Sequence, residues 1–157
     1  MSGEPRSLIA PARIDWRDGR PYSLDYDDIY HDADAHDKAR RNFIAPSRLL
    51  ERADRPAGAG GRADSKGSGR DVFRIAETGF GTGMNFAGTA HALRDAPVAR
   101  LHFIGFDAHP IAPHEFRAIA RERAADIPLY DELAAKYPPL LPGWHRRELA
   151  NGRVTLS

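Results

Sequence analysis

Three glycines at alternate positions, Gly79, Gly81 and Gly83, carry the clearest chemical signal in the sequence. A short apolar run (residues 72–76) and the acidic Glu77 precede them, and a helix-compatible segment begins directly after them. Glycines are needed in such a strand–turn–helix because the backbone turns tightly and approaches a nucleotide-like ligand with no Cβ in the way. We therefore predict a cofactor loop at this point of the chain.

The spacing of the glycines separates the candidate cofactors. A dinucleotide fold uses Gly-x-Gly-x-x-Gly to hold a pyrophosphate at a helix N-terminus. Here the third glycine comes one residue early, and Met84 stands where Gly or Ala is expected. The carboxylate of Glu77 would repel a pyrophosphate but suits a ligand with an ammonium and a sulfonium. The pattern favours S-adenosylmethionine, with dinucleotide binding and a turn without a ligand as alternatives.

A second acidic residue supports this choice. Residues 101–106 form an apolar run that is typical of the next strand, and the run ends at Asp107. In α/β sheets, an acid at the end of the second strand can accept hydrogen bonds from ribose hydroxyls. Turns also favour Asp without any ligand. Because this one follows a glycine loop, we assign Asp107 to the ribose.

Strands alternate with helices, which predicts an α/β fold with a parallel sheet and right-handed crossovers. A short strand within residues 9–16 is expected before a turn at Asp18-Gly19. The other expected elements are strands at 72–76, 101–106 and 153–156, and helices at 84–93, from Pro113 onward and at 129–136. A doubly wound sheet has about five or more strands, covered on both faces. Only three strands are expected from residue 72 onward, so we expect an incomplete sheet.

Composition divides the chain into three parts. Residues 1–52 read as an N-terminal lid and strand segment, and residues 71–157 as the first part of a cofactor-binding domain. Between them, residues 53–70 hold five glycines and no large apolar side chain. Such a stretch cannot bury enough surface to order itself, so we expect a flexible loop.

The totals exclude several classes of protein. The 157 residues suffice for one domain, and 41% hydrophobic with 29% charged residues fits a soluble globular chain. A net charge of +1 gives no global electrostatic case for nucleic acid. The chain has no Cys, which excludes disulfides and cysteine chemistry. We find no signal peptide and no apolar run near the roughly 20 residues of a membrane span, so a cytoplasmic location is expected.

Two constellations could suggest metal ions, and neither holds. The acidic stretch at residues 25–37 lacks the residue order of a calcium loop and the closing Glu. His31 and His36 are five apart, as are His109 and His114, which puts the members of each pair on different helix faces. We predict no metal site.

Over nearly its whole length the sequence resembles the methyltransferase half of the bifunctional tRNA wobble-uridine modification enzymes, the MnmC family. Four blocks carry the resemblance, and two of them are specific to that family rather than to methyltransferases at large. The blocks are Trp16 with Gly19-Arg20-Pro21-Tyr22-Ser23 and Tyr26-Asp27-Asp28-Ile29-Tyr30, the glycine loop at 76–86, the second strand at 101–111, and Pro142-Gly143-Trp144-His145-Arg146 with Gly152-Arg153-Val154-Thr155-Leu156.

The resemblance implies a fold and a function. The fold is an incomplete Rossmann-like, S-adenosylmethionine-dependent methyltransferase sheet preceded by an N-terminal lid. The family's methyltransferase half moves a methyl group to the exocyclic amine of 5-aminomethyl-2-thiouridine at the tRNA wobble position. A separate FAD-dependent half first removes a carboxymethyl group.

The resemblance also implies site residues. The methionine part of the cofactor would be held by Glu77, Thr78, Gly79, Phe80, Gly81, Thr82 and Gly83. Asn85 would help to anchor the helix start, and Asp107, a Glu in the family, would bind the ribose. The run at residues 27–30 would fold over the cofactor.

The chain ends before the family's Gly-Asp turn near the adenine, its Asp-Gly-Phe-Ala-Pro block near the reacting amine, and its FAD half. We therefore expect no catalytic residue here and no activity of the chain alone, with a companion chain as one source of the missing half. Two other functions stay open. They are a non-catalytic cofactor-binding module and a methyltransferase that acts on another small molecule.

Overall fold

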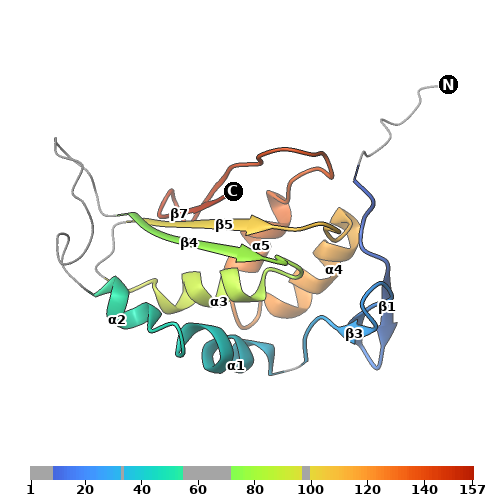
Figure 1. Ribbon diagram of the computed structural model, residues 1–157, viewed down its shortest axis with the longest axis horizontal. Helices are drawn as coiled ribbons and strands as arrows, with labels where there is room; N and C mark the ends of the chain where they lie inside the picture. Colours follow the sequence, from blue (N-terminus) through green and yellow to red (C-terminus); the bar gives the residue numbers. More distant parts are fainter. Residues whose placement is uncertain (1–8, 33, 55–71, 97–99) are drawn as a thin grey trace.

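The computed structural model describes residues 9–32, 34–54, 72–96 and 100–157, which form two sheets and a set of helices (Figure 1). The smaller sheet is an antiparallel meander of β1 (Ile14–Arg17), β2 (Arg20–Ser23) and β3 (Asp28–Ile29). The predicted turn is confirmed: Asp18 and Gly19 have φ of 51° and 72°. Two left-handed residues suit a two-residue hairpin, because their twist matches that of the strands.

The larger sheet has the order β4-β5-β7-β6. Its first three strands, β4 (Val72–Thr78), β5 (Arg100–Phe106) and β7 (Val154–Leu156), are parallel, as predicted. The fourth, β6 (Arg147–Leu149), was not predicted and pairs with β7 antiparallel, so the sheet is mixed rather than parallel throughout. The two are joined by a tight turn at residues 150–152, all with positive φ.

Three helices that were expected from the sequence are present. They are α3 (Met84–Ala92) between β4 and β5, then α4 (Pro113–Arg123) and α5 (Leu129–Ala135) after β5. α4 begins with Pro at a position where the missing N–H is not needed. These helices and β5 share one core, whose fully buried side chains include Phe86, Phe103, Phe116, Ile119, Tyr130 and Leu133. The core fixes the frame in which the glycine loop sits.

The N-terminal segment also forms helices, which the sequence had not indicated. α1 (Ala35–Ala39) runs into a π-helical turn, η1 (Arg40–Ile44), and α2 (Leu49–Ala53) follows. α1 and η1 pack closely on α3, where a Cβ at Gly88 would lie 3.4 Å from that of Ala39. Ala53 is buried at the end of α2, so the loop that we expected from residue 53 cannot begin there. Its residues from 55 onward lie outside the described ones.

The small sheet lies beyond the carboxyl ends of β4 and β5, and α1 lies on the same side of those strands as α3 (Figure 1). The glycine loop follows the carboxyl end of β4. The N-terminal segment therefore passes the same end of the larger sheet as this loop. A hydrogen bond of 3.0 Å from the N–H of Ala12 to the carbonyl of Pro110 ties it to the segment after β5. This arrangement places the N-terminal segment over the glycine loop.

Candidate cofactor-binding site

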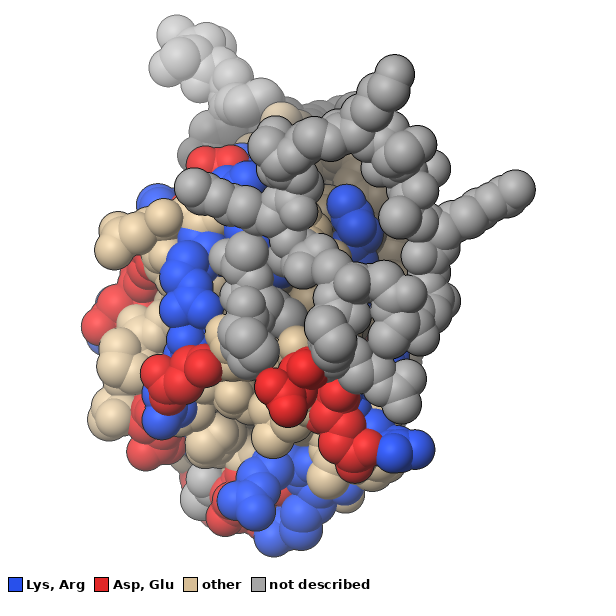
Figure 2. All heavy atoms as spheres, turned by 90° about the vertical axis from the view of Figure 1, so that its left-hand side faces the viewer, with Lys and Arg blue, Asp and Glu red and all other residues tan. Residues whose placement is uncertain are grey.

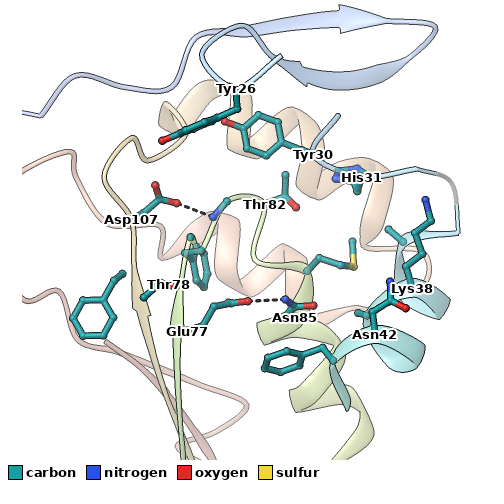
Figure 3. Close-up of a pocket in the computed structure, with 18 of the residues that line it drawn as sticks. Tyr26, Tyr30, His31, Lys38, Asn42, Glu77, Thr78, Thr82, Asn85 and Asp107 are labelled. Carbon is teal, nitrogen blue, oxygen red and sulfur yellow. Dashed lines mark hydrogen bonds between the residues drawn. The ribbon is translucent and has the colours of Figure 1, made fainter. Parts of the chain in front are cut away.

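A cavity of about 960 Å³ lies at the carboxyl ends of β4 and β5, between the glycine loop and the N-terminal segment (Figure 3). Ligands of open α/β sheets bind at this end of the strands. The residues assigned to the site from the sequence that line the cavity are Glu77, Thr78, Gly79, Phe80, Gly81, Thr82, Asn85 and Asp107. Gly83 caps the start of α3 and does not line it.

The glycine loop has the backbone conformation that its sequence predicts. Gly79, Gly81 and Gly83 all have positive φ, at 80°, 52° and 70°, a region that residues with a Cβ rarely adopt. The loop is also fastened to the neighbouring strand, because the N–H groups of Gly79 and Phe80 donate to the carbonyl of Phe106 at 2.7 and 3.1 Å. The loop shape is therefore set before any ligand arrives.

Glu77 lies in the cavity with one carboxylate oxygen paired and one unpaired. The side-chain amide of Asn85 donates to Oε1 at 2.6 Å, while Oε2 is buried and has no hydrogen-bond partner among the described residues. Burial raises the pKa of Glu77 above its ordinary value, against the opposing effect of Asn85. A buried acceptor without a donor is costly, and a cation or N–H group in the cavity would relieve that cost.

Asn85 and Asp107 each make a contact that the sequence had not indicated. No side chain caps the start of α3, and Asn85 instead orients the carboxylate of Glu77. Asp107 accepts the backbone N–H of Gly81 at 2.7 Å and that of His109 at 3.0 Å. The carboxylate of Asp107 thus connects the end of β5 to the glycine loop.

The N-terminal segment covers the cavity with aromatic side chains rather than acids. Tyr30 lies against the glycine loop, 3.5 Å from where a Cβ of Gly81 would be, and Tyr26 shares a 2.8 Å hydrogen bond with Nδ1 of His109. Of the expected cover at residues 27–30, Asp27 and Asp28 do not line the cavity. Asp27 accepts the hydroxyl of Tyr22 instead.

His31 lines the cavity and had not been assigned to the site from the sequence. Its side chain is only 6% exposed, and Nε2 accepts a 3.1 Å hydrogen bond from Nε of Arg123. Burial, with a smaller effect of Arg123, lowers its pKa to about 4, so the ring is neutral near pH 7. From the sequence we weigh this residue as half of a zinc pair with His36, whose ring packs edge-on against His91. A lone His gives no signal that could have revealed its position.

Among the described residues, we also looked for metal clusters, membrane-spanning helices and charged surfaces. No group of three or more His, Asp or Glu side chains among them could hold a metal ion. None of their helices is long and apolar enough to cross a membrane. Figure 2 shows the face at the amino ends of β4 and β5, where basic and acidic side chains alternate outside the grey atoms. This face has the mixed charge of an ordinary solvated surface.

Comparison with known proteins gives one consistent result. No protein-family model matches the chain. The tRNA 5-methylaminomethyl-2-thiouridine biosynthesis bifunctional protein MnmC of Thiobacillus denitrificans is 41% identical over 152 residues, which are 95% of this chain and 22% of that protein. The proteins of the same name from Burkholderia vietnamiensis and Legionella pneumophila are 38% and 37% identical, again over 95% of the chain and 22% of their own length.

The chain thus spans about a fifth of the length of the curated relatives that it matches. The resemblance inferred from its sequence motifs is confirmed at the level of the family. Over nearly its whole length, the chain is homologous to a segment of the MnmC bifunctional proteins.

Proposed function

We propose that this chain is the S-adenosylmethionine-binding part of a tRNA methyltransferase, built on an incomplete Rossmann-like sheet with an N-terminal lid. The observation that carries the proposal is the buried, unpaired Oε2 of Glu77 in a glycine-lined cavity. The name of the relatives, tRNA 5-methylaminomethyl-2-thiouridine biosynthesis protein, supports the reaction class. The methyl acceptor would be the exocyclic amine of 5-aminomethyl-2-thiouridine at the wobble position.

The residues of the cavity fit this ligand. Oε2 of Glu77 would accept the α-ammonium of the methionine part, while Asn85 holds the other oxygen in place. A carboxylate has about four acceptor positions, so Asp107 could accept a ribose hydroxyl while it keeps its two backbone donors. Gly79 and Gly81 leave room for the ligand against the backbone. When bound, S-adenosylmethionine supplies an electrophilic methyl group on its sulfonium.

A dinucleotide fits the same cavity less well. Two carboxylates, Glu77 and Asp107, line it, and their mutual repulsion contributes to the raised pKa of Glu77. A pyrophosphate would add further negative charge beside a carboxylate that already lacks a partner. A sulfonium and an ammonium reverse the sign of that interaction.

The proposal assigns binding to this chain and leaves catalysis unassigned. An attacking amine must lose a proton, for which a nearby carboxylate is the natural acceptor. The carboxylates of Glu77 and Asp107 in the cavity are both given binding roles, so neither is assigned as that proton acceptor. The rest of the active site and the FAD-dependent activity would belong to the other parts of MnmC-type proteins, joined to this segment or on a companion chain.

The test has two stages. Calorimetry should show that the chain binds S-adenosylhomocysteine and not NAD; the reverse preference would overturn the cofactor assignment. Labelled S-adenosylmethionine is then supplied with tRNA that carries the aminomethyl wobble uridine, and with the same tRNA lacking that group. The chain alone should bind the cofactor without transferring its methyl group, because no catalytic residue is assigned to it. Transfer to the tRNA with the aminomethyl group would contradict this expected inactivity, and transfer to both tRNAs would also contradict the proposed acceptor.

A further inference from the structure

Two buried polar atoms without a partner belong to side chains that line the same cavity. One is Oε2 of Glu77, an acceptor, and the other is Nδ1 of His31. Neither has a hydrogen-bond partner in the part of the chain that the structure describes. Figure 3 shows them on different walls, His31 beside Tyr30 of the N-terminal segment and Glu77 beside Asn85.

The contact with Arg123 fixes which nitrogen of His31 carries the proton. A guanidinium can only donate, so Nε2 must be the acceptor of the 3.1 Å hydrogen bond. The ring is neutral near pH 7 and holds one proton, which therefore sits on Nδ1. The unpaired atom is a hydrogen-bond donor, and the charge on Arg123 polarises the ring so that this donor favours an anion.

The neighbouring acid does not satisfy this donor. Asp32 is adjacent in sequence, but its carboxylate accepts the ammonium of Lys38 and the guanidinium of Arg20, the latter at 3.3 Å. On the N-terminal wall of the cavity, His31 thus offers a donor whose ring is hydrogen-bonded to the charged Arg123. On the other wall, Glu77 offers an acidic acceptor.

We propose that the cavity recognises an α-amino-acid zwitterion, with Nδ1–H of His31 donating to the α-carboxylate and Oε2 of Glu77 accepting from the α-ammonium. An unpaired donor and an unpaired acceptor are the complement of that group, and buried charge-assisted bonds are strong enough to select it. The inference rests on the proposed function and extends it. His31 makes the site prefer ligands that carry the carboxylate beside the amine over ligands that carry the amine alone.

Three ligands separate the contributions by calorimetry. They are S-adenosylhomocysteine, its decarboxylated analogue 5′-S-(3-aminopropyl)-5′-thioadenosine, and 5′-methylthioadenosine, which lacks both charged groups. The affinity of the chain for the first ligand should be higher than for the second by about tenfold or more. His31→Phe should remove that preference and leave the affinities for the second and third ligands within about twofold.

Two further variants guard against a merely structural effect. His31→Asn keeps an N–H donor at the δ position and should retain most of the preference for the carboxylate. Glu77→Gln should weaken both amine-bearing ligands and spare 5′-methylthioadenosine. Equal weakening of all three ligands by His31→Phe, or no change, would overturn the role of His31 alone. Failure of the unaltered chain to bind any of the three would overturn the proposed function itself.

Discussion

The carboxylate of Asp107 accepts a hydrogen bond of 2.7 Å from the backbone N–H of Gly81 and so joins the end of β5 to the loop after β4. These two features are far apart in sequence, and we had given them separate contacts with the ligand. Their hydrogen bond means that one side chain would both shape the glycine loop and touch the ribose. Changes at Asp107 should therefore affect stability and binding together.

We expect Asp107→Ala to lower both the melting temperature and the affinity for S-adenosylhomocysteine, the latter about tenfold. Asp107→Asn keeps an oxygen that can accept the N–H of Gly81, so it should restore most of the melting temperature. Thermal unfolding and calorimetry measure the two effects. An alanine variant with unchanged affinity would show that Asp107 only supports the loop.

Glu77 makes the stability of the ligand-free chain depend on pH. Its pKa in the folded chain is raised above 4.5, so the folded state holds the proton more tightly than the unfolded state. The free energy of unfolding should fall as the pH rises from about 4.5 through the raised pKa. Glu77→Gln should remove this loss and be more stable than the parent at neutral pH. Urea denaturation across this pH range, without ligand, measures both proteins. If the free energies of unfolding of the parent and the variant changed in the same way with pH, the prediction would be wrong.

Two glycines offer a matched pair for testing the cavity. Gly79 and Gly19 have φ of 80° and 72°, and a Cβ at either would meet no atom within 4 Å. Alanine at each should therefore cost a similar strain, about 1 kcal/mol, in urea denaturation. Only Gly79 lines the cavity, so only Gly79→Ala should weaken binding of S-adenosylhomocysteine. Equal binding by both variants would place the ligand elsewhere.

Tyr130, in α5, also holds the glycine loop in place. This fully buried side chain donates its hydroxyl to the carbonyl of Thr82 at 3.2 Å. Tyr130→Phe leaves that carbonyl without the donor and should cost about 1 kcal/mol of unfolding free energy in urea. Tyr26→Phe is the control, because Tyr26 is 63% exposed and should change stability by less than about 0.5 kcal/mol. Similar losses in both variants would argue against the buried bond.

The parts of the fold that sequence could predict are those with a local signal. β4, β5 and α3 each follow from an apolar run or a helical pattern, and their ends differ from expectation by at most two residues. β6 has the sequence Arg-Glu-Leu, which carries no apolar run. It becomes a strand because the turn at residues 150–152 folds it back onto β7. Such pairing depends on tertiary contacts that no short window contains.

The site divides in the same way. Glu77, the glycines and Asp107 could be assigned because the signals are local. These signals are the spacing of the glycines, the acid before them and the acid at the end of the next strand. His31 could not, since its role depends on Arg123 in α4, which lies far along the chain. Asn85 was assigned only through the family resemblance, and its bond to Glu77 required the geometry of the loop.

The cavity is made from two parts of the chain that differ in how locally they form. Glu77 and Asp107 meet within a single β4–α3–β5 unit. Tyr30 and His31 come from before residue 55 and join that unit through distant contacts such as His31 with Arg123. Closing long loops is entropically costly, and contacts distant in sequence slow folding. During refolding, the glycine loop should therefore form early, and affinity for a ligand should appear in a later phase than the sheet.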